Sequence, residues 1–313
     1  MRVAIFTDET GWHTRQLQAA LKARGAVGRC LDLADCRIDT GASSHGLVLP
    51  SYGSGLPDAA LVRGIAGGSF EQVTKRLGVL HALRELGVPV YNDARAIERS
   101  VDKSMTSLLL HQAGVPTPPT WATESAAEAQ RLVMRESAAG HALVLKPLFG
   151  SQGRGLVRVG CVDGQHVPLP ELKAFGGLAY LQRFVPAVRQ AMAHDLRVMV
   201  IGGRAVSAMR RVGQDWIHNV SRGARGEAAV LTPAMAGIAE AAAAALSMDY
   251  AGIDLMPDPK RPGGLLVLEV NGVAAWHGLQ RVTPFNIAQA IVDDLLQRRL
   301  PGTCPGARPQ HVA

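Results

Sequence analysis

Short apolar runs alternate with amphipathic stretches over residues 1–99 of the chain. The apolar runs have the length of buried strands, and the amphipathic stretches have helical spacing and are followed by glycine. The predicted strands are residues 3–7, 46–50, 59–62 and 88–91, and the predicted helices are residues 14–23 and 70–86. This alternation is typical of a parallel sheet covered by helices, so residues 1–99 are predicted to form an N-terminal α/β domain.

The pattern changes after residue 100, where apolar strands come in pairs around glycine turns. Such pairs predict hairpins and therefore antiparallel sheets. The predicted strands are residues 142–147, 156–159, 196–201, 205–212, 253–256 and 265–270, and the predicted helices are residues 102–113, 124–137, 233–247 and 286–298. We expect an α/β (α+β) protein with subdomains at 100–181 and 182–300, and a loose tail at 301–313.

Composition narrows the class of protein. The chain has 313 residues, of which 47% are hydrophobic and 19% charged, as expected for a globular protein of two or three subdomains. Its longest apolar run is shorter than the ~20 residues of a membrane span, and residues 1–7 are too short for a signal peptide. The four cysteines show neither metal-ligand spacing nor a disulfide framework. A cytoplasmic protein with no membrane partner is expected.

The net charge of +7 raises the question of nucleic acid. The basic residues are scattered, and aromatic residues make up only 4% of the chain, which argues against a stacking platform for bases. We therefore expect no nucleic-acid partner. An anionic small-molecule substrate fits the charge equally well.

The first candidate for chemistry is Lys146, which ends an apolar strand and precedes Gly150, Gly153 and Gly155. Glycines let backbone N–H groups approach phosphate oxygens closely, and a lysine adds a point charge to the same phosphates. The lysine precedes the glycines, so this is not a P-loop. A flexible hairpin turn with an edge lysine is the alternative reading.

The second candidate is the set Asp254, Glu269 and Asn271. Glu269 and Asn271 alternate on one predicted strand and therefore project from the same face. Polar side chains at the end of a buried strand need partners, and hard oxygen ligands suit magnesium. A capping or salt-bridge role at a strand end is the alternative.

Arginines on two predicted strands form a third candidate. Arg197 lies on the first, and Arg210 and Arg211 are neighbours on the second. Neighbouring strand residues point to opposite faces, so only one of this pair can share a site with Arg197. Solvated strand arginines are the alternative.

Together these motifs resemble the ATP-grasp superfamily, and within it the RimK-like branch of amino-acid (α-L-glutamate) ligases. The resemblance spans about residues 100–298 and rests on several motifs in the family's order and spacing. The motifs are Asp102-Lys103, residues 144–155, residues 182–185, Asp195-Leu196-Arg197, Arg210-Arg211, Asn219, Asp254 and Glu269-Val270-Asn271. It implies an ATP-grasp fold in which an N-terminal pre-ATP-grasp domain precedes two subdomains that clamp ATP.

The resemblance also implies roles for single residues. Arg197 and Arg210 would hold the transferring phosphoryl group, and Asp254, Glu269 and Asn271 would bind Mg²⁺, with Mn²⁺ as an alternative. The residues implied to bind ATP are Lys103, Lys146, Gly150, Ser151, Gln152, Gly153, Gly155, Gln182, Arg183, Phe184, Val185, Asp195 and Asn219. Of these, residues 182–185 would meet the adenine, mainly through backbone groups.

Two departures from the family pattern concern the linker and the loop after the metal strand. Arg183 stands where the family usually has glutamate, and the family's proline shortly after Asn271 is missing. The first puts the role of residue 183 in doubt. The second makes substrate choice less transferable than ATP binding, because this loop helps to shape the acceptor pocket.

A narrower resemblance concerns residues 11–13, 69–74 and 276–281, which look like a RimK-like subgroup linked to tetrahydromethanopterin and methylofuran cofactor pathways in methylotrophic bacteria. Trp12, His13, Arg63 and Trp276 are the candidate substrate contacts. Residues 12 and 13 follow the first strand, at the edge where open α/β sheets bind ligands. A packed loop tryptophan and a solvent histidine are the alternative.

Three functions remain open from the sequence. The first is an ATP-dependent ligase that joins a small-molecule carboxylate to an amino acid, most plausibly L-glutamate, on a cofactor precursor or peptide, through an acyl phosphate. The others are an ATP-grasp phosphotransferase and a basic binding protein without catalysis. Family members are often dimers or tetramers, so a homo-oligomer is also compatible with the resemblance.

Overall fold

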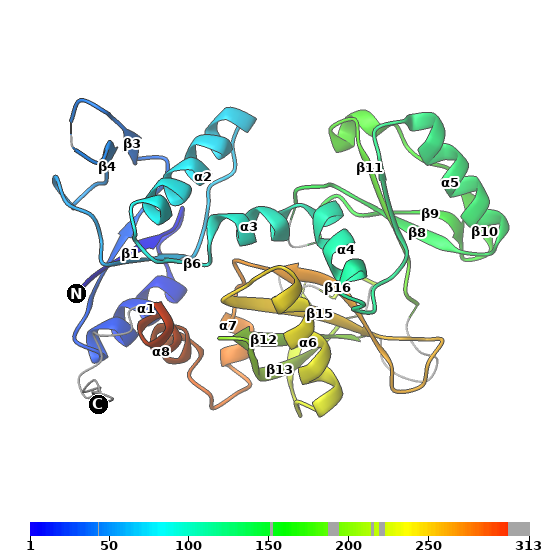
Figure 1. Ribbon diagram of the computed structural model, residues 1–313. Coiled ribbons are helices and arrows are strands. Elements are labelled where there is room, and N and C mark those ends of the chain that lie inside the picture. Colours follow the sequence, from blue (N-terminus) through cyan, green and yellow to red (C-terminus); the bar gives the residue numbers. More distant parts are fainter. Residues whose placement is uncertain (43, 151–152, 187–193, 214–215, 219–222, 300–313) are drawn as a thin grey trace, which may run out of the picture. The chain divides into compact units, whose positions relative to one another are not determined.

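The computed structural model describes residues 1–42, 44–150, 153–186, 194–213, 216–218 and 223–299. Contacts divide the chain into two compact units (Figure 1). Unit 1 combines residues 1–97 with the residues from 273 onward, and unit 2 comprises residues 98–272. The predicted tail, residues 301–313, lies outside the described residues, and the predicted boundaries at 99/100 and 181/182 stay predictions.

Unit 1 is built on a four-stranded sheet in the order β2-β1-β5-β6, in which every neighbouring pair is parallel. The parallel N-terminal sheet expected from the sequence is therefore present. The elements of this unit are β1 (Arg2–Phe6), α1 (Trp12–Ala23), β2 (Val27–Leu31), β3 (Arg37–Ile38), β4 (Leu47–Val48), β5 (Ala59–Val62), α2 (Phe70–Glu85), β6 (Val90–Tyr91), α7 (His277–Gln280) and α8 (Ile287–Arg299).

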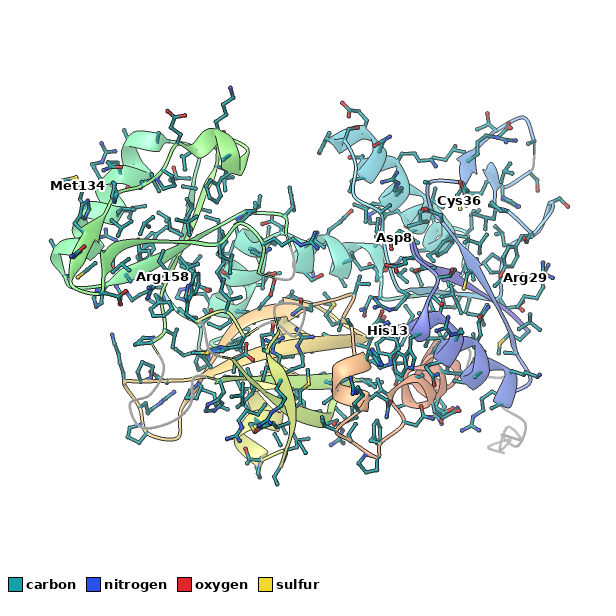
Figure 2. The ribbon with its side chains drawn as sticks, turned by 180° about the vertical axis from the view of Figure 1, so that it is seen from behind. Asp8, His13, Arg29, Cys36, Met134 and Arg158 are labelled. Atoms are coloured by element: carbon teal, nitrogen blue, oxygen red, sulfur yellow. The ribbon has the colours of Figure 1, made fainter. Side chains whose placement is uncertain are left out.

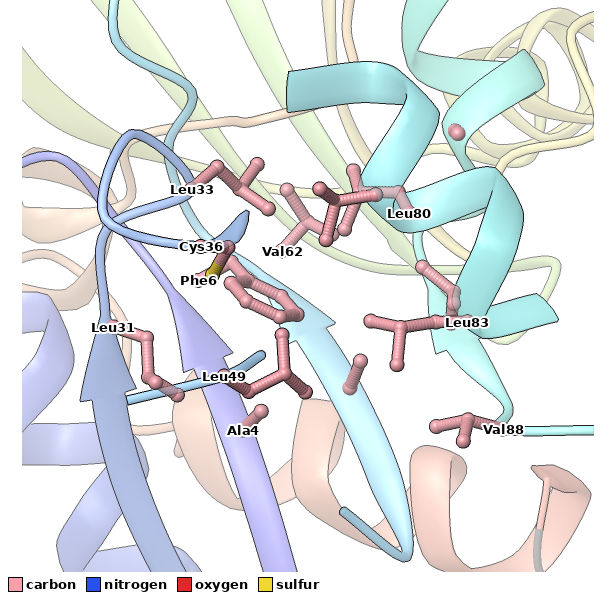
Figure 3. Packing of buried hydrophobic residues seen from close by; sticks show 14 of the residues in the cluster. Ala4, Phe6, Leu31, Leu33, Cys36, Leu49, Val62, Leu80, Leu83 and Val88 are labelled. Carbon is pink, nitrogen blue, oxygen red and sulfur yellow. The ribbon is translucent and has the colours of Figure 1, made fainter. Parts of the chain in front are cut away.

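The central strands of this sheet are apolar because both faces are covered. All four residues of β5 and the last four of β1 are buried. On one face Phe6 and Val62 meet Leu80 and Leu83 of α2, and Cys36 lies against the same cluster (Figure 3). On the other face α1 packs against α8, which brings the end of the described chain back to its beginning.

Unit 2 contains two five-stranded antiparallel sheets, as the hairpin pattern predicted. The first has the order β10-β9-β8-β11-β7. Its elements and the helices beside it are α3 (Ala94–Val101, which crosses the unit boundary), α4 (Lys103–Gln112), β7 (Thr120–Thr123), α5 (Ala126–Ala138), β8 (Ala142–Lys146), β9 (Val157–Val162), β10 (Gln165–Val167), a 3₁₀ turn (Leu172–Phe175) and β11 (Ala179–Arg183). Helix α5 covers one face of this sheet with Ala129, Leu132 and Val133.

The second sheet has the order β14-β13-β12-β15-β16, and α6 covers one of its faces. Its elements are β12 (His194–Ile201), β13 (Arg204–Val212), β14 (Arg225–Ala229), α6 (Pro233–Ala245), β15 (Tyr250–Pro257) and β16 (Leu265–Asn271). The uncovered face carries the polar residues discussed below.

Local capping signals fix the helix starts in unit 2. The Asp102 carboxylate accepts hydrogen bonds from the backbone N–H groups of Ser104 and Met105, and Ser125 and Thr232 cap α5 and α6 in the same manner. The elements that were not predicted from the sequence are β2, β3, α3, β7, β10, the 3₁₀ turn, β11, β14 and α7.

Candidate functional site

Lys146 ends β8 at the edge of a pocket in unit 2. Its Nζ donates to Gln182 Oε1 at 2.7 Å on the neighbouring strand β11. Burial, together with the nearby charge of Lys103, lowers the pKa of Lys146 to about 8, against the opposing effects of Glu269 and Asp254. The amine is therefore mainly charged at neutral pH and loses its charge as the pH rises through about 8.

The glycine turn after Lys146 has the backbone conformation that requires glycine. Gly153 and Gly155 have φ of +67° and +70°, in the left-handed region. Lys103 Nζ, from the first turn of α4, donates to Gly150 O at 2.7 Å and lies 3.8 Å from Glu269 Oε1. Lys103 thus links the glycine turn to the strand that carries the predicted metal ligands.

A cross-strand row of polar residues lies on the uncovered face of the second sheet. In the sheet register Arg197 pairs with Asp254, and Asp254 pairs with Glu269. The Asp254 carboxylate accepts two hydrogen bonds from Arg197, through Nε and, at 3.0 Å, Nη2. Asn271 Nδ2 donates to Gly252 O at 3.1 Å and approaches Asp254 Oδ2 at 3.5 Å.

Arg211, and not the predicted Arg210, shares this face. Its Nη2 lies 3.0 Å from Asp254 Oδ2 and 2.6 Å from Asp195 Oδ2, and its side chain is 5% exposed. Arg210 points to the opposite side, where it pairs with Glu227 and is 48% exposed. The assignment of Arg210 to the site is therefore corrected to Arg211, because strand alternation turns the two neighbours apart.

The four buried charges hold one another in defined ionisation states. Burial opposes ionisation of Asp254, but Arg197 and Arg211 outweigh it and hold the pKa of this carboxyl below its usual range. Burial raises the pKa of Asp195 to about 6 despite its bidentate contact with Arg211. Two guanidinium groups and two carboxylates balance, as a buried charge cluster requires.

The predicted adenine linker continues from the end of β11. Gln182 is buried and faces Lys146, whereas Arg183 turns to the α5 face, where its Nε and Nη2 donate to Glu136 Oε2 at 3.0 and 2.6 Å. Phe184 meets Trp216 edge-on at 5.9 Å. Arg158, labelled on β9 in Figure 2, lies 5.4 and 5.7 Å above these two rings.

These groups surround a pocket of about 870 Å³, open mouth included. Predicted residues in its lining are Lys103, Lys146, Gly150, Gly153, Gln182, Arg183, Phe184, Val185, Asp195, Asp254 and Glu269. The lining includes neither Gly155, Arg197, Arg210 and Asn271 nor Arg211. Ser151, Gln152 and Asn219 lie outside the described residues.

Several lining residues were not predicted as site residues: Val144, Pro147, Arg154, Leu156, Trp216, Ile217, His218, Met256 and Leu268. Met256 could have been found, because it alternates with Asp254 on one strand. Trp216 to His218 follow β13 in a loop without periodicity, and only the tertiary structure brings them to the pocket.

The donor set suits magnesium only in part. Within the described ranges, no three His, Cys, Asp or Glu side chains gather closely enough to hold a metal ion. Glu269 offers a carboxylate that is 31% exposed, and Asn271 offers its amide oxygen, both hard donors of the kind Mg²⁺ takes from proteins. The Asp254 carboxylate is already engaged by two arginines.

The predicted substrate residues meet in unit 1. His13 Nε2 accepts hydrogen bonds from the backbone N–H groups of Trp276 and His277 at 3.1 and 3.2 Å, beside the α7 turn (Figure 2). The Arg63 guanidinium lies 5.2 Å from the Trp276 ring centroid and donates to Val273 O at 3.3 Å. Trp12 stacks on His277 at 4.5 Å and begins helix α1, so the expectation of a loop tryptophan is wrong.

His13 is a neutral acceptor in this arrangement. Burial lowers its pKa to about 3, with further contributions from Arg63 and His277. The expectation of a solvent histidine is therefore wrong, since the ring is half-buried and anchors the chain after the last strand.

Sequence comparison identifies relatives over nearly the whole chain. Residues 100–295 match the RimK-like ATP-grasp domain, and residues 1–97 match the RimK PreATP-grasp domain. The chain is 34% identical to the tetrahydromethanopterin:alpha-L-glutamate ligase of Methanococcus maripaludis, covering 95% of this chain and 98% of that protein. For the enzyme of the same name from Methanosarcina acetivorans the identity is 31%, covering 92% and 96%.

Solved structures show the same fold. The ATP-grasp ligase PsnB, complexed with minimal precursor, Mg and ADP, has a TM-score of 0.69 at 20% identity, covering 95% of this chain and 98% of PsnB. A RimK domain ATP-grasp protein from Sphaerobacter thermophilus has a TM-score of 0.66 at 22% identity, covering 95% and 100%. The expected ATP-grasp fold is confirmed, and no helix among the described residues is long and apolar enough to cross a membrane. The chain belongs to the RimK-like ATP-grasp family of ATP-dependent ligases.

Proposed function

We propose that this ligase adds L-glutamate to the carboxylate of a reduced pterin cofactor related to tetrahydromethanopterin. The observation that carries the substrate proposal is the 34% identity to a tetrahydromethanopterin:alpha-L-glutamate ligase over 95% of the chain. The pocket in unit 2 supports the ATP-dependent half of the reaction, because it gathers two lysines and a carboxylate beside a glycine turn.

Binding of ATP is assigned to the pocket groups on the first sheet. Lys146 and Lys103 would hold the phosphates together with backbone N–H groups of the glycine turn, and the backbone of residues 182–185 would receive the adenine. Asp195 would lie near the nucleotide. Support comes from the position of both lysines in the pocket lining beside Gly150 and Gly153, since cations and backbone N–H groups bind phosphate oxygens. Residues 100–181 and 182–300 are proposed as the two halves of the clamp.

In the chemical step a carboxylate oxygen of the pterin attacks the γ-phosphorus of ATP, and ADP leaves. The amine of glutamate then attacks the acyl carbon, and the bond to phosphate breaks as the amide forms. This transfer needs positioning and neutralisation of charge more than covalent help. Arg197 and Arg211, paired with Asp254 and Asp195, are proposed to orient the phosphoryl group, and the pocket lining to shield the acyl phosphate from water.

Glu269, Asn271 and Asp254 are the proposed holders of Mg²⁺, with Mn²⁺ as a substitute of the same donor preference. The ion would supply positive charge to the phosphates of ATP. Asp254 reaches such a role only by giving up part of its contact with Arg197 or Arg211, so Glu269 and Asn271 are the primary holders.

Trp12, His13, Arg63 and Trp276 are proposed to act on the acceptor side. Arg63 and Trp12 are the direct contact candidates, since both are only half-buried and offer a cation and a ring. His13 and Trp276 would act indirectly by fixing the loop from residue 273 to 277.

Product mass tests the function. Purified protein is incubated with ATP, MgCl₂, L-glutamate and tetrahydromethanopterin, and the pterin is analysed by mass spectrometry. A ligase product gains glutamate minus water, whereas a phosphotransferase product gains phosphate. D-glutamate and L-aspartate serve as matched amine controls. Phosphorylated pterin without an adduct would overturn the proposal, and so would salt-dependent nucleic-acid binding without any ATP turnover.

A further inference from the structure

Arg183 stands where the family usually has glutamate. Its side chain turns to Glu136 on α5, while the residue itself belongs to the pocket lining. It is the last residue of β11 and pairs in register with Leu143, whose side chain packs under α5. The preceding Gln182 points the other way, to Lys146. Strand alternation thus separates a side chain that faces the pocket from one that faces α5.

On the α5 side Arg183 meets a buried carboxylate. Both Nε and Nη2 donate to Glu136 Oε2, at 3.0 and 2.6 Å, and Glu136 is 5% exposed. Arg135 Nη2 lies 3.3 Å from the other carboxylate oxygen, and His141 Nδ1 lies 3.2 Å from Oε2. Burial opposes ionisation of Glu136, but Arg183 foremost outweighs it and keeps the pKa of this carboxyl below its usual range.

The backbone at Arg183 and Phe184 is hydrogen-bonded to two neighbouring segments. Its N–H donates to Pro119 O at 2.8 Å, and the N–H of Phe184 donates to Ala142 O at 2.9 Å. Residues 182–185 all belong to the pocket lining. A charge-assisted contact at this point fixes where the linker leaves the sheet, because helix α5 is itself anchored by its apolar face.

We propose that Glu136 is a positioning residue for the nucleotide: through Arg183 it holds the linker whose backbone receives the adenine. The inference rests on the proposed ATP site. Glu136 is not among the residues that line the pocket; from helix α5 it fixes the strand end from which the linker continues. Loss of the carboxylate then weakens ATP binding in the ground state and the transition state alike.

The test compares Glu136→Gln with Glu128→Gln on the same helix, where Glu128 pairs with Arg131 at the surface. For Glu136→Gln we expect the KM and the calorimetric Kd for ATP to rise about ten-fold, the loss of one charge-assisted contact, with kcat nearly unchanged. Glu128→Gln keeps the wild-type values. A purely structural role predicts a lower melting temperature with unchanged Kd for ATP, and that result would overturn the inference.

Three further variants keep the test decisive. If Glu136→Gln does not fold, Arg183→Lys retains the charge but loses the paired donors, and the same rise in Kd is expected. The exchange Glu136→Arg with Arg183→Glu is expected to recover affinity relative to Arg183→Glu alone. If the wild-type protein binds no ATP, the proposed function itself is refuted. If the wild-type protein binds ATP and the Glu136 and Arg183 variants bind it with the same Kd, only this inference is refuted.

Discussion

At the scale of single residues, the site depends on charges that are buried only because they are paired. Removal of a carboxylate or guanidinium from water costs several kcal/mol, and only well-formed pairs offset that cost. Asp254 meets Arg197 on one side and Arg211 on the other, while Asp195 accepts from Arg211. Arg210 makes a surface pair with Glu227, of the kind that contributes little to stability.

The adjacent arginines therefore offer a matched pair of variants. Arg211→Gln leaves two buried carboxylates under-neutralised and is expected to lower the free energy of unfolding by about 3–5 kcal/mol and to reduce kcat strongly. Arg210→Gln is expected to change stability by less than about 1 kcal/mol and to retain turnover. Urea unfolding and steady-state rates measure both. Equal effects of the two substitutions would contradict the assignment.

The lowered pKa of Lys146 predicts that the affinity for ATP depends on pH. Its pKa of about 8 in the free protein rises when phosphates bind, so binding takes up a proton near that pH. Affinity for ATP is then unaffected by this group at neutral pH and falls as pH rises through about 8. Calorimetry at increasing pH measures it, with Lys146→Arg as a permanently charged control. A flat profile for the wild-type protein would show that Lys146 does not meet the phosphates.

At the scale of elements, the chain after β16 is held by packing in place of the family's proline. Trp276 is 1% exposed, and His13 accepts one hydrogen bond each from the backbone N–H groups of Trp276 and His277. Arg63 donates to Val273 O. These contacts join segments more than 200 residues apart in sequence. A buried tryptophan supplies a large apolar contact with a defined orientation.

The low pKa of His13 predicts how the free energy of unfolding varies with pH. Its folded-state pKa of about 3 lies below the unfolded value of 6.5, so the unfolded chain binds the proton more readily. The contribution of His13 is therefore complete above about pH 6.5 and is lost as pH falls toward 3. His13→Gln keeps an acceptor without titrating, and its free energy of unfolding should fall less between about pH 7 and 5. If the free energy of unfolding falls equally with pH in the wild-type protein and in His13→Gln, the contribution assigned to His13 is contradicted.

At the scale of the molecule, the two sheets of unit 2 contribute different parts of one pocket. The first sheet supplies Lys146 and the linker, the second supplies Asp254 and Glu269, and Lys103 connects them. A ligand that touches both sheets stabilises their arrangement by mass action.

Magnesium removal tests this division. ATP with Mg²⁺ is expected to raise the melting temperature, and an excess of EDTA to abolish turnover while leaving part of the ATP-induced shift. Glu269→Ala is expected to behave as wild type does in EDTA and to lose nearly all turnover, because the primary metal holder is gone. Wild-type ATP turnover by Glu269→Ala would refute the metal assignment. Restoration of turnover by Mn²⁺ tests the proposed substitution.

The sequence by itself determined the family, the parallel N-terminal sheet, the hairpins and most helix starts. These features depend on periodicity, glycine turns and capping residues, which act over a few neighbouring positions. It also placed Lys146, Asp254, Glu269 and Asn271 on strands, with Lys146 and Asn271 at strand ends, since motif spacing is a property of the chain itself.

Only the tertiary structure decided which side chains face one another. The choice of Arg211 over Arg210 follows from the pairing of β13 with β12, the partner of Arg183 comes from a helix 47 positions earlier, and the anchor of Trp276 comes from the first helix. These contacts depend on burial and on pairing between distant segments, and neither can be predicted from a few neighbouring residues. The glycine turn therefore stands where the sequence predicted, while the charges around the pocket are arranged by the fold.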